Sequence, residues 1–157
     1  MILDGPTAMH FSRIAHETGD VAVLRRRELA MLASSTGDGE DVFGLTHGVM
    51  DSRTWIVALT DVRLILISHP RLRGKRRIEI ALQDLESIVP MIGRFTSALQ
   101  IATMTGRHVI GRVPRTAVQS FALTTSKLSV LCGRRQSSDA YRNRLSRLVA
   151  EAVTDLV

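Results

Sequence analysis

The sequence is short of cysteine, aromatic residues and long apolar runs, and each shortage removes a class of protein. Cys132 is the only cysteine, which excludes an internal disulfide and fits a reducing compartment. Aromatic residues make up 4% of the 157 residues, too few for a surface that stacks the bases of a single-stranded nucleic acid. The longest apolar run is far below the roughly 20 residues of a membrane-spanning helix, and residues 1–20 are too polar for a signal peptide. These shortages predict a soluble, cytoplasmic protein.

Motifs for catalysis and metal binding are also missing. The sequence has no glycine-rich phosphate loop and no G-x-S-x-G nucleophile motif. Its histidines lie off helical register or in different predicted elements, and no Cys/His spacing is typical of zinc ligation. The acidic cluster of Asp38, Glu40 and Asp41 lacks the ligand spacing of a calcium loop and is expected to be a surface loop. We therefore expect no enzyme, no cofactor and no metal.

Positive charge is what the sequence has in excess. Lys and Arg number 21 against 15 Asp and Glu, which gives a formal net charge of +6. This excess favours contact with phosphate groups, either of nucleic acid or of an anionic membrane surface. Hydrophobic residues make up 45% of the chain, enough for the packed core of one domain.

Residues 1–38 form the first of three zones and are predicted to be a helical extension. A weak helical pattern covers residues 10–17, and residues 18–20 break it. Asp20 is placed to cap a second helix. The apolar face of that helix would comprise Val21, Leu24, Leu29, Met31 and Leu32.

The second zone, residues 39–132, changes to the period of two that is typical of strands, and we predict that it forms one domain. Seven strand candidates lie at residues 42–50, 54–59, 62–68, 76–82, 87–92, 98–105 and 108–113. Their short connections favour an antiparallel meander. Pro114 stands where a covering helix would begin. The run at residues 62–68 is apolar on both faces, so its second face needs a cover from this chain or from a partner.

The third zone, residues 133–157, is predicted to be a separate amphipathic helix capped by Ser138 or Asp139. Its apolar stripe comprises Tyr141, Leu145, Leu148, Val149, Ala152, Val153 and Leu156. The stripe either packs on the chain itself or forms a partner interface, for example in a homodimer. The domain already has a covering helix after Pro114, which favours the partner interface.

Three segments of the middle zone resemble the bacterial pleckstrin-homology-like domain family. The most specific is LTDVRLIL at residues 59–66, which is similar to a hairpin of that family; the others are residues 78–88 and the hairpin at residues 98–113. Together they cover about residues 40–131. The resemblance implies an α+β fold, in which a seven-stranded, strongly bent antiparallel barrel or sandwich is capped by a C-terminal helix. The predicted N- and C-terminal helices of this chain would be additions to it.

The polar residues of the LTDVRLIL hairpin are expected to hold the turn. Thr60 and Asp61 have short side chains that can bond the turn backbone. Arg63 begins the next strand, and we expect its guanidinium to pair with a carboxylate such as Asp61 or Asp84.

A basic connection at residues 69–77 carries five formal positive charges and no acid. In phosphoinositide-binding members of the resembled family, the first, third and sixth hairpin loops form an open end of the barrel. The resemblance implies an anion-binding cluster here of Arg53, Arg71, Arg73, Lys75, Arg76 and Arg107. The first hairpin offers only Arg53 where those members place a basic pair, so a specific inositol-phosphate pocket is not expected. A solvated loop, adsorption to anionic lipid and contact with nucleic-acid phosphate all remain open.

The function that these features favour is a non-catalytic binding module. It would engage a protein partner or oligomerise, with weak attraction to anionic surfaces, in the cytoplasm or peripherally at the membrane. The alternative is a sequence-independent nucleic-acid-binding protein that uses the basic loop and the arginines of the third zone.

Overall fold

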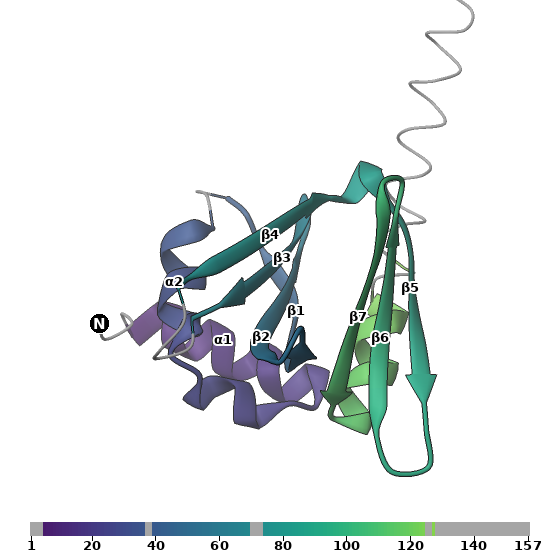
Figure 1. The fold of residues 1–157 in the computed structure, drawn as a ribbon. Helices are drawn as coiled ribbons and strands as arrows, with labels where there is room; N and C mark the ends of the chain where they lie inside the picture. Colours follow the sequence, from purple (N-terminus) through teal and green to yellow (C-terminus); the bar gives the residue numbers. More distant parts are fainter. Residues whose placement is uncertain (1–4, 37–38, 70–73, 125–126, 128–157) are drawn as a thin grey trace, which may run out of the picture.

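The computed structural model describes residues 5–36, 39–69, 74–124 and 127, and begins with three short helices (Figure 1). These are α1 (Gly5–Thr18), the 3-10 helix η1 (Val21–Arg25) and α2 (Glu28–Ser35). The strands are β1 (Val42–Met50), β2 (Arg53–Thr60), β3 (Arg63–Ser68), β4 (Arg76–Ala81), β5 (Leu85–Ile92), β6 (Ser97–Thr103) and β7 (Gly106–Val113), with the 3-10 helix η2 (Leu82–Asp84) before β5. Residues 115–124 are helical. The seven predicted strands and the helix after Pro114 are therefore confirmed.

The seven strands form one antiparallel sheet in the order β4-β3-β2-β1-β7-β6-β5, bent sharply into two halves (Figure 1). A single residue pair, Val49 with Gly111, joins β1 of the first half to β7 of the second. A Cβ atom at Gly48 would lie 2.6 Å from the carbonyl oxygen of Gly111, so only glycine allows the two backbones to approach here. The sheet does not close, and the predicted barrel is more accurately an open, bent sheet with edges at β4 and β5.

The main core lies between the two halves of the sheet and the helix at residues 115–124. Trp55, Leu99, Ile101, Ile110 and Phe121 are almost fully buried in it. The indole nitrogen of Trp55 donates a hydrogen bond to the Met50 carbonyl at 2.9 Å, so its polar atom is satisfied. The C-terminal helix thus caps the core, as predicted.

A second core lies on the outer face of β1–β3, under α1, η1 and α2. Successive side chains on a strand point to opposite faces. Leu64 and Leu66 of β3 therefore enter the main core, whereas Ile65 and Ile67 pack under the helices. The helices contribute Phe11, Ile14, Ala15, Val23, Leu29 and Leu32 to this second core. The cover that the apolar run at residues 62–68 required comes from the same chain.

The predicted second helix is interrupted, and the expectation for Asp20 was wrong. A 3-10 turn ends at Arg25 and α2 begins only at Glu28, after extended backbone at Arg26. The Asp20 side chain makes no cap hydrogen bond. Its carboxylate points instead toward β1, where it bonds to the Thr46 hydroxyl, the His47 backbone N–H and the His47 ring.

Both edges of the sheet carry features that discourage further strand pairing. On β5, Pro90 removes a backbone donor. On β4, Arg76, Arg77 and Glu79 place charge along the edge.

Candidate functional site

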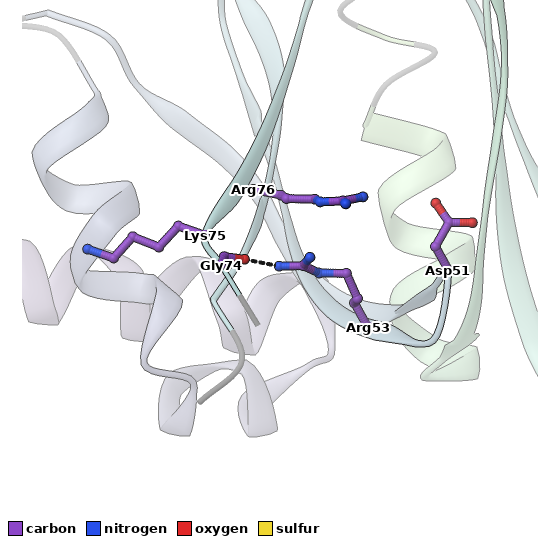
Figure 2. A pocket seen from close by; sticks show the side chains of 5 residues that line it. All are labelled: Asp51, Arg53, Gly74, Lys75 and Arg76. Atoms are coloured by element: carbon purple, nitrogen blue, oxygen red, sulfur yellow. Dashed lines mark hydrogen bonds between the residues drawn. The ribbon is translucent and has the colours of Figure 1, made fainter. Parts of the chain in front are cut away.

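The predicted basic end of the domain contains a pocket of about 490 Å³ where the β1–β2 turn meets the start of β4 (Figure 2). The lining residues are Asp51, Arg53, Gly74, Lys75 and Arg76. Asp51 and Ser52 have positive φ values of 53° and 58°, as the two central residues of a tight type I′ hairpin require. This turn places Arg53 opposite Met50 at the first position of β2.

Arg53 is a buried tether for the basic loop, because only 6% of it is exposed. Its Nη2 donates to the Gly74 carbonyl oxygen, and its Nε donates to Ser68 Oγ at 3.2 Å. Its Cζ lies 5.9 Å from the centroid of the Trp55 ring, within the range of a cation–π contact. These contacts anchor the end of the loop on β2 and β3 and occupy much of the donor capacity of the guanidinium.

Lys75 and Arg76 are exposed, and their side chains make no hydrogen bond or ion pair within the described part of the chain. Figure 2 shows Arg76 extending across the pocket on the side of Asp51, whereas Lys75 points the other way. Of the three cationic residues that line the pocket, only Arg76 extends across it, and the Asp51 carboxylate on its rim opposes an anion. This arrangement suits weak electrostatic attraction better than tight capture of one phosphate group.

The structure brings together three of the six predicted anion-binding residues: Arg53, Lys75 and Arg76. Arg107 does not line this pocket. It lies four residues along β7 from Gly111, the pairing partner of Val49, which is about 13 Å in a strand. Arg71 and Arg73 are outside the described residues, as is the whole predicted interface stripe from Tyr141 to Leu156.

The LTDVRLIL hairpin holds its own turn, as expected for Thr60. Thr60 Oγ1 accepts hydrogen bonds from the backbone N–H groups of Val62 and Arg63 and donates to Glu40 at 2.8 Å. Asp61 Oδ1 accepts from the N–H of Asp41 at 3.2 Å. These residues fix the hairpin and the chain entering β1.

Arg63 pairs with carboxylates, as predicted, but they belong to Glu40 and Glu79, and the named partners Asp61 and Asp84 were wrong. Its Nε lies 2.8 Å from Glu40 Oε1, and its Nη1 lies 3.0 Å from Glu79 Oε2. The hydrogen bonds to Glu40 raise the pKa of the Arg63 guanidinium above its usual value, and burial opposes this effect only in part. From the sequence, the acidic cluster that contains Glu40 was expected only to be a surface loop. The pairing of Glu40 with Arg63 was missed because the two residues are 23 positions apart and leave no local sequence pattern.

A buried carboxylate, Asp20, joins the N-terminal helices to β1. Its Oδ2 accepts from Thr46 Oγ1 at 2.8 Å and from the His47 backbone N–H at 2.9 Å, and lies 2.6 Å from His47 Nδ1. Burial alone would raise the pKa of Asp20, but the hydrogen bonds from His47 and Thr46 outweigh it and hold the pKa below its ordinary value. No pattern in the sequence indicates this contact.

The outer face of β5–β7 exposes an apolar strip that the N-terminal helices do not reach. Val89, Gln100 and Val109 lie in register across the three strands, with Met91 opposite Ala98 beside them. Val89, Met91 and Val109 are 44%, 46% and 49% exposed. An aligned apolar strip on a sheet face is typical of a contact surface.

Neither a metal site nor a membrane span is found among the described residues. No group of three or more His, Cys, Asp or Glu side chains in this part of the chain could hold a metal ion. Among the described helices, none is both long and apolar enough to cross a bilayer.

Comparison with known proteins places this geometry in a family. The sequence pattern described as "Bacterial PH domain" matches residues 37–126. A crystal structure of a pleckstrin homology domain from Shewanella amazonensis SB2B has a similar fold, with a TM-score of 0.50 and 18% sequence identity over 64% of this chain and 94% of that one. No curated protein matches the chain. The family pattern spans more than half of the sequence, and the chain therefore belongs to the bacterial PH domain family.

Proposed function

We propose that this chain is a non-catalytic binding module that engages a protein partner through the outer face of β5–β7. PH domains are in general binding modules without catalytic activity, which supports the first part of the proposal. The observation that carries the second part is the strip of Val89, Met91 and Val109, each almost half exposed. The blunted edges at β4 and β5 favour a face-on contact over strand addition.

The test is proximity labelling in the native host with a matched pair of variants. Val89→Asp with Val109→Asp places two charges on the strip and should abolish labelling of the partner. Val21→Asp with Val62→Asp changes two exposed valines elsewhere, which are 48% and 55% exposed, and should leave labelling intact. Equal recovery of the same proteins with both pairs would contradict this surface assignment.

The basic pocket adds weak attraction to an anionic partner in this proposal. Replacing Arg71, Arg73, Lys75 and Arg76 by Ser should reduce retention on anionic vesicles at low salt by up to about 600-fold, since each basic residue near such a surface contributes about 1 kcal/mol, or roughly fivefold. The melting temperature should hardly change, because exposed charges contribute little to stability. Steeply salt-dependent retention of duplex DNA in place of vesicles would support the nucleic-acid alternative.

Self-association is part of the same proposal and rests on the apolar stripe of residues 141–156. Leu145→Asp with Leu148→Asp should convert a dimer to a monomer in sedimentation equilibrium at micromolar concentration. A dimer that survives the double substitution would place the interface elsewhere. A wild-type monomer across that range would remove the proposal.

A further inference from the structure

A tight turn between β5 and β6 presents the most exposed large apolar side chain in the described chain. The Gly93 N–H donates to the Thr96 carbonyl at 2.9 Å. A Cβ atom at Gly93 would lie 2.7 Å from that oxygen, so the turn requires glycine. At its tip, Phe95 is 90% exposed. The loop projects past the end of β7 in Figure 1, so no neighbouring element shields it.

Three arginines surround this phenylalanine. Arg94, Arg112 and Arg115 line a pocket of about 370 Å³ together with Phe95. Arg94 Cζ lies 5.5 Å from the centroid of the Phe95 ring. All three arginines are exposed, and in the described part of the chain none of their side chains has a hydrogen bond or ion pair to another residue. The guanidiniums are therefore available to an external anion.

Acidic residues are absent from the stretch of chain that carries this turn and the three arginines. Residues 87–127 contain Arg94, Arg107, Arg112, Arg115 and Lys127, but no Asp or Glu. No Asp or Glu is among the residues that line the pocket at Phe95, in contrast to the pocket at Arg76, where Asp51 stands on the rim. The residues that line the pocket at Phe95 therefore carry the larger net positive charge of the two pockets.

The backbone is strained where it presents Arg112. The β6–β7 register shifts between Ser97 and Leu99, and the irregularity places Arg112 at a φ of 53°. Residues other than glycine are disfavoured in this left-handed conformation, because the Cβ atom crowds the carbonyl oxygen. A strained arginine beside two other unpaired arginines suggests selection for what its side chain binds.

We propose that this tip docks on the surface of an anionic lipid bilayer, with Phe95 entering the interfacial region and Arg94, Arg112 and Arg115 contacting lipid phosphates. Met91 and Ile92, which are 46% and 41% exposed just before the turn, extend the apolar part of the contact. Aromatic and aliphatic side chains next to cations suit the boundary between head groups and acyl chains. A nucleic-acid backbone would satisfy the arginines but would leave Met91 and Ile92 in water. This surface shares Met91 with the outer-face strip, but Phe95 and the three arginines lie outside the strip, and the variants below leave the strip and the pocket at Arg76 unchanged.

The test is co-sedimentation of the full chain with vesicles of phosphatidylcholine containing about one third phosphatidylglycerol, with pure phosphatidylcholine as the neutral reference. We expect Phe95→Ser to weaken binding about tenfold, from the apolar area that it removes. Arg94→Ser with Arg115→Ser should weaken it by about twentyfold or more, at roughly fivefold for each basic residue. The matched control replaces one exposed apolar and one exposed basic residue elsewhere, Val62→Ser with Arg25→Ser, and should bind like the wild type.

Two further variants separate docking from misfolding and from simple charge attraction. Arg112→Gly relieves the strained backbone, so it should raise the melting temperature while weakening vesicle binding about fivefold. Phe95→Trp should show a blue-shifted emission with anionic vesicles and quenching by lipids brominated on the acyl chain; Trp55 is buried and does not report on lipid.

Three outcomes would overturn the proposal. The first is an absence of wild-type retention on anionic vesicles at low salt. The second is an emission of the Phe95→Trp variant that neither shifts with anionic vesicles nor is quenched by brominated lipid. The third is tighter binding to duplex DNA than to vesicles, with Phe95→Ser leaving both unchanged, since this result would assign the arginines to nucleic acid.

Discussion

The two halves of the bent sheet differ in what lies against their outer faces. On β2 and β3 the outward-pointing Ile56, Ile65 and Ile67 are 0% exposed under the N-terminal helices. On β5 and β7 the corresponding Val89 and Val109 remain almost half exposed. The strands alternate with the same period in both halves, so the difference lies in the residues of the second face. A face of isoleucines acquires a cover from its own chain, whereas a strip of valines beside Ala and Gln remains available to a partner.

The two halves also differ in charge. Every ion pair found in the described residues joins groups between Arg13 and Glu79, and acids of the first half neutralise its arginines. Residues 87–127 carry basic residues without acids. The first half uses ion pairs to hold its own elements together, although Lys75 and Arg76 stay exposed, whereas residues 87–127 present only basic groups.

Among the changes that test this comparison, removal of the N-terminal helices should have the largest effect on the stability of the fold. A chain that begins at residue 39 would expose Leu45, Ile56, Ala58, Ile65 and Ile67. Each large aliphatic contributes about 1.5–3 kcal/mol when buried, so the loss approaches the whole stability of about 5–15 kcal/mol that is typical of a domain. We expect dye binding to exposed apolar surface and no cooperative thermal transition. A cooperative melt within a few degrees of the full chain would show that the first half does not need its cover.

Shortening one apolar side chain at each of the two outer faces should give the next largest effect on stability. Leu32, which is 0% exposed in α2, should cost about 2–5 kcal/mol when changed to Ala. Val109→Ala removes a side chain of similar character from the bare face and should change stability by no more than about 0.5 kcal/mol. Urea denaturation measures both. Equal costs at the two positions would mean that the second face is not free.

Asp20→Asn tests the polar contact that joins the helices to β1. The pKa of Asp20 is lower in the folded chain than its unfolded value of about 3.9, so the carboxylate stabilises the fold above about pH 4. This contribution is lost as the pH falls through the folded pKa. At pH 6 the variant should be less stable by about 1–3 kcal/mol, and the gap should close toward pH 3. Urea denaturation of both proteins across this range checks the sign, and a gap that widens on acidification would contradict it.

The smallest effects should come from two left-handed residues, one in each half. Ser52 in the β1–β2 turn and Arg112 in the β7 irregularity have φ values of 58° and 53°. Changing either residue to Gly should stabilise the fold by about 1 kcal/mol, because glycine adopts this conformation without strain. Thermal unfolding compares the two gains. Vesicle binding should fall only for Arg112→Gly, and an equal fall for Ser52→Gly would point to an indirect effect of the fold.

The strands could be predicted well from the sequence because burial has a local signature. The alternation of Ile78 and Ile80 and the doubly apolar run at residues 62–68 mark strands and the number of faces that each one buries. Pro114 marks the start of the covering helix in the same way. The segment that covers the second face of β3 could not be predicted, because periodicity records that a face is buried but not which segment covers it.

The missed features of the site depend on distant partners or on backbone strain. Asp20 meets Thr46 and His47 across more than 25 residues, and Glu40 meets Arg63 across 23. The left-handed backbone at Arg112 could not be predicted from the sequence, because glycine is the residue expected in that conformation and arginine does not indicate it.

The predicted anion site formed only in part, for a geometric reason. Arg53, Lys75 and Arg76 meet because they belong to adjacent hairpin ends. Arg107 required a closed barrel mouth that the open sheet does not make. The sequence did not indicate Phe95 and Arg94 as site residues. Their exposure follows from the turn between β5 and β6, which holds them away from the core.

The order of elements along the chain has a consequence for synthesis. The helices α1 and α2 precede β1–β3, so they have already left the ribosome when Ile65 and Ile67 emerge. An apolar strand that appears before its cover is exposed to aggregation until the remaining residues are made. Here the covering helices are present before the isoleucines, and a circular permutant that moves the same helices to the C-terminus would leave the isoleucines exposed until translation ends.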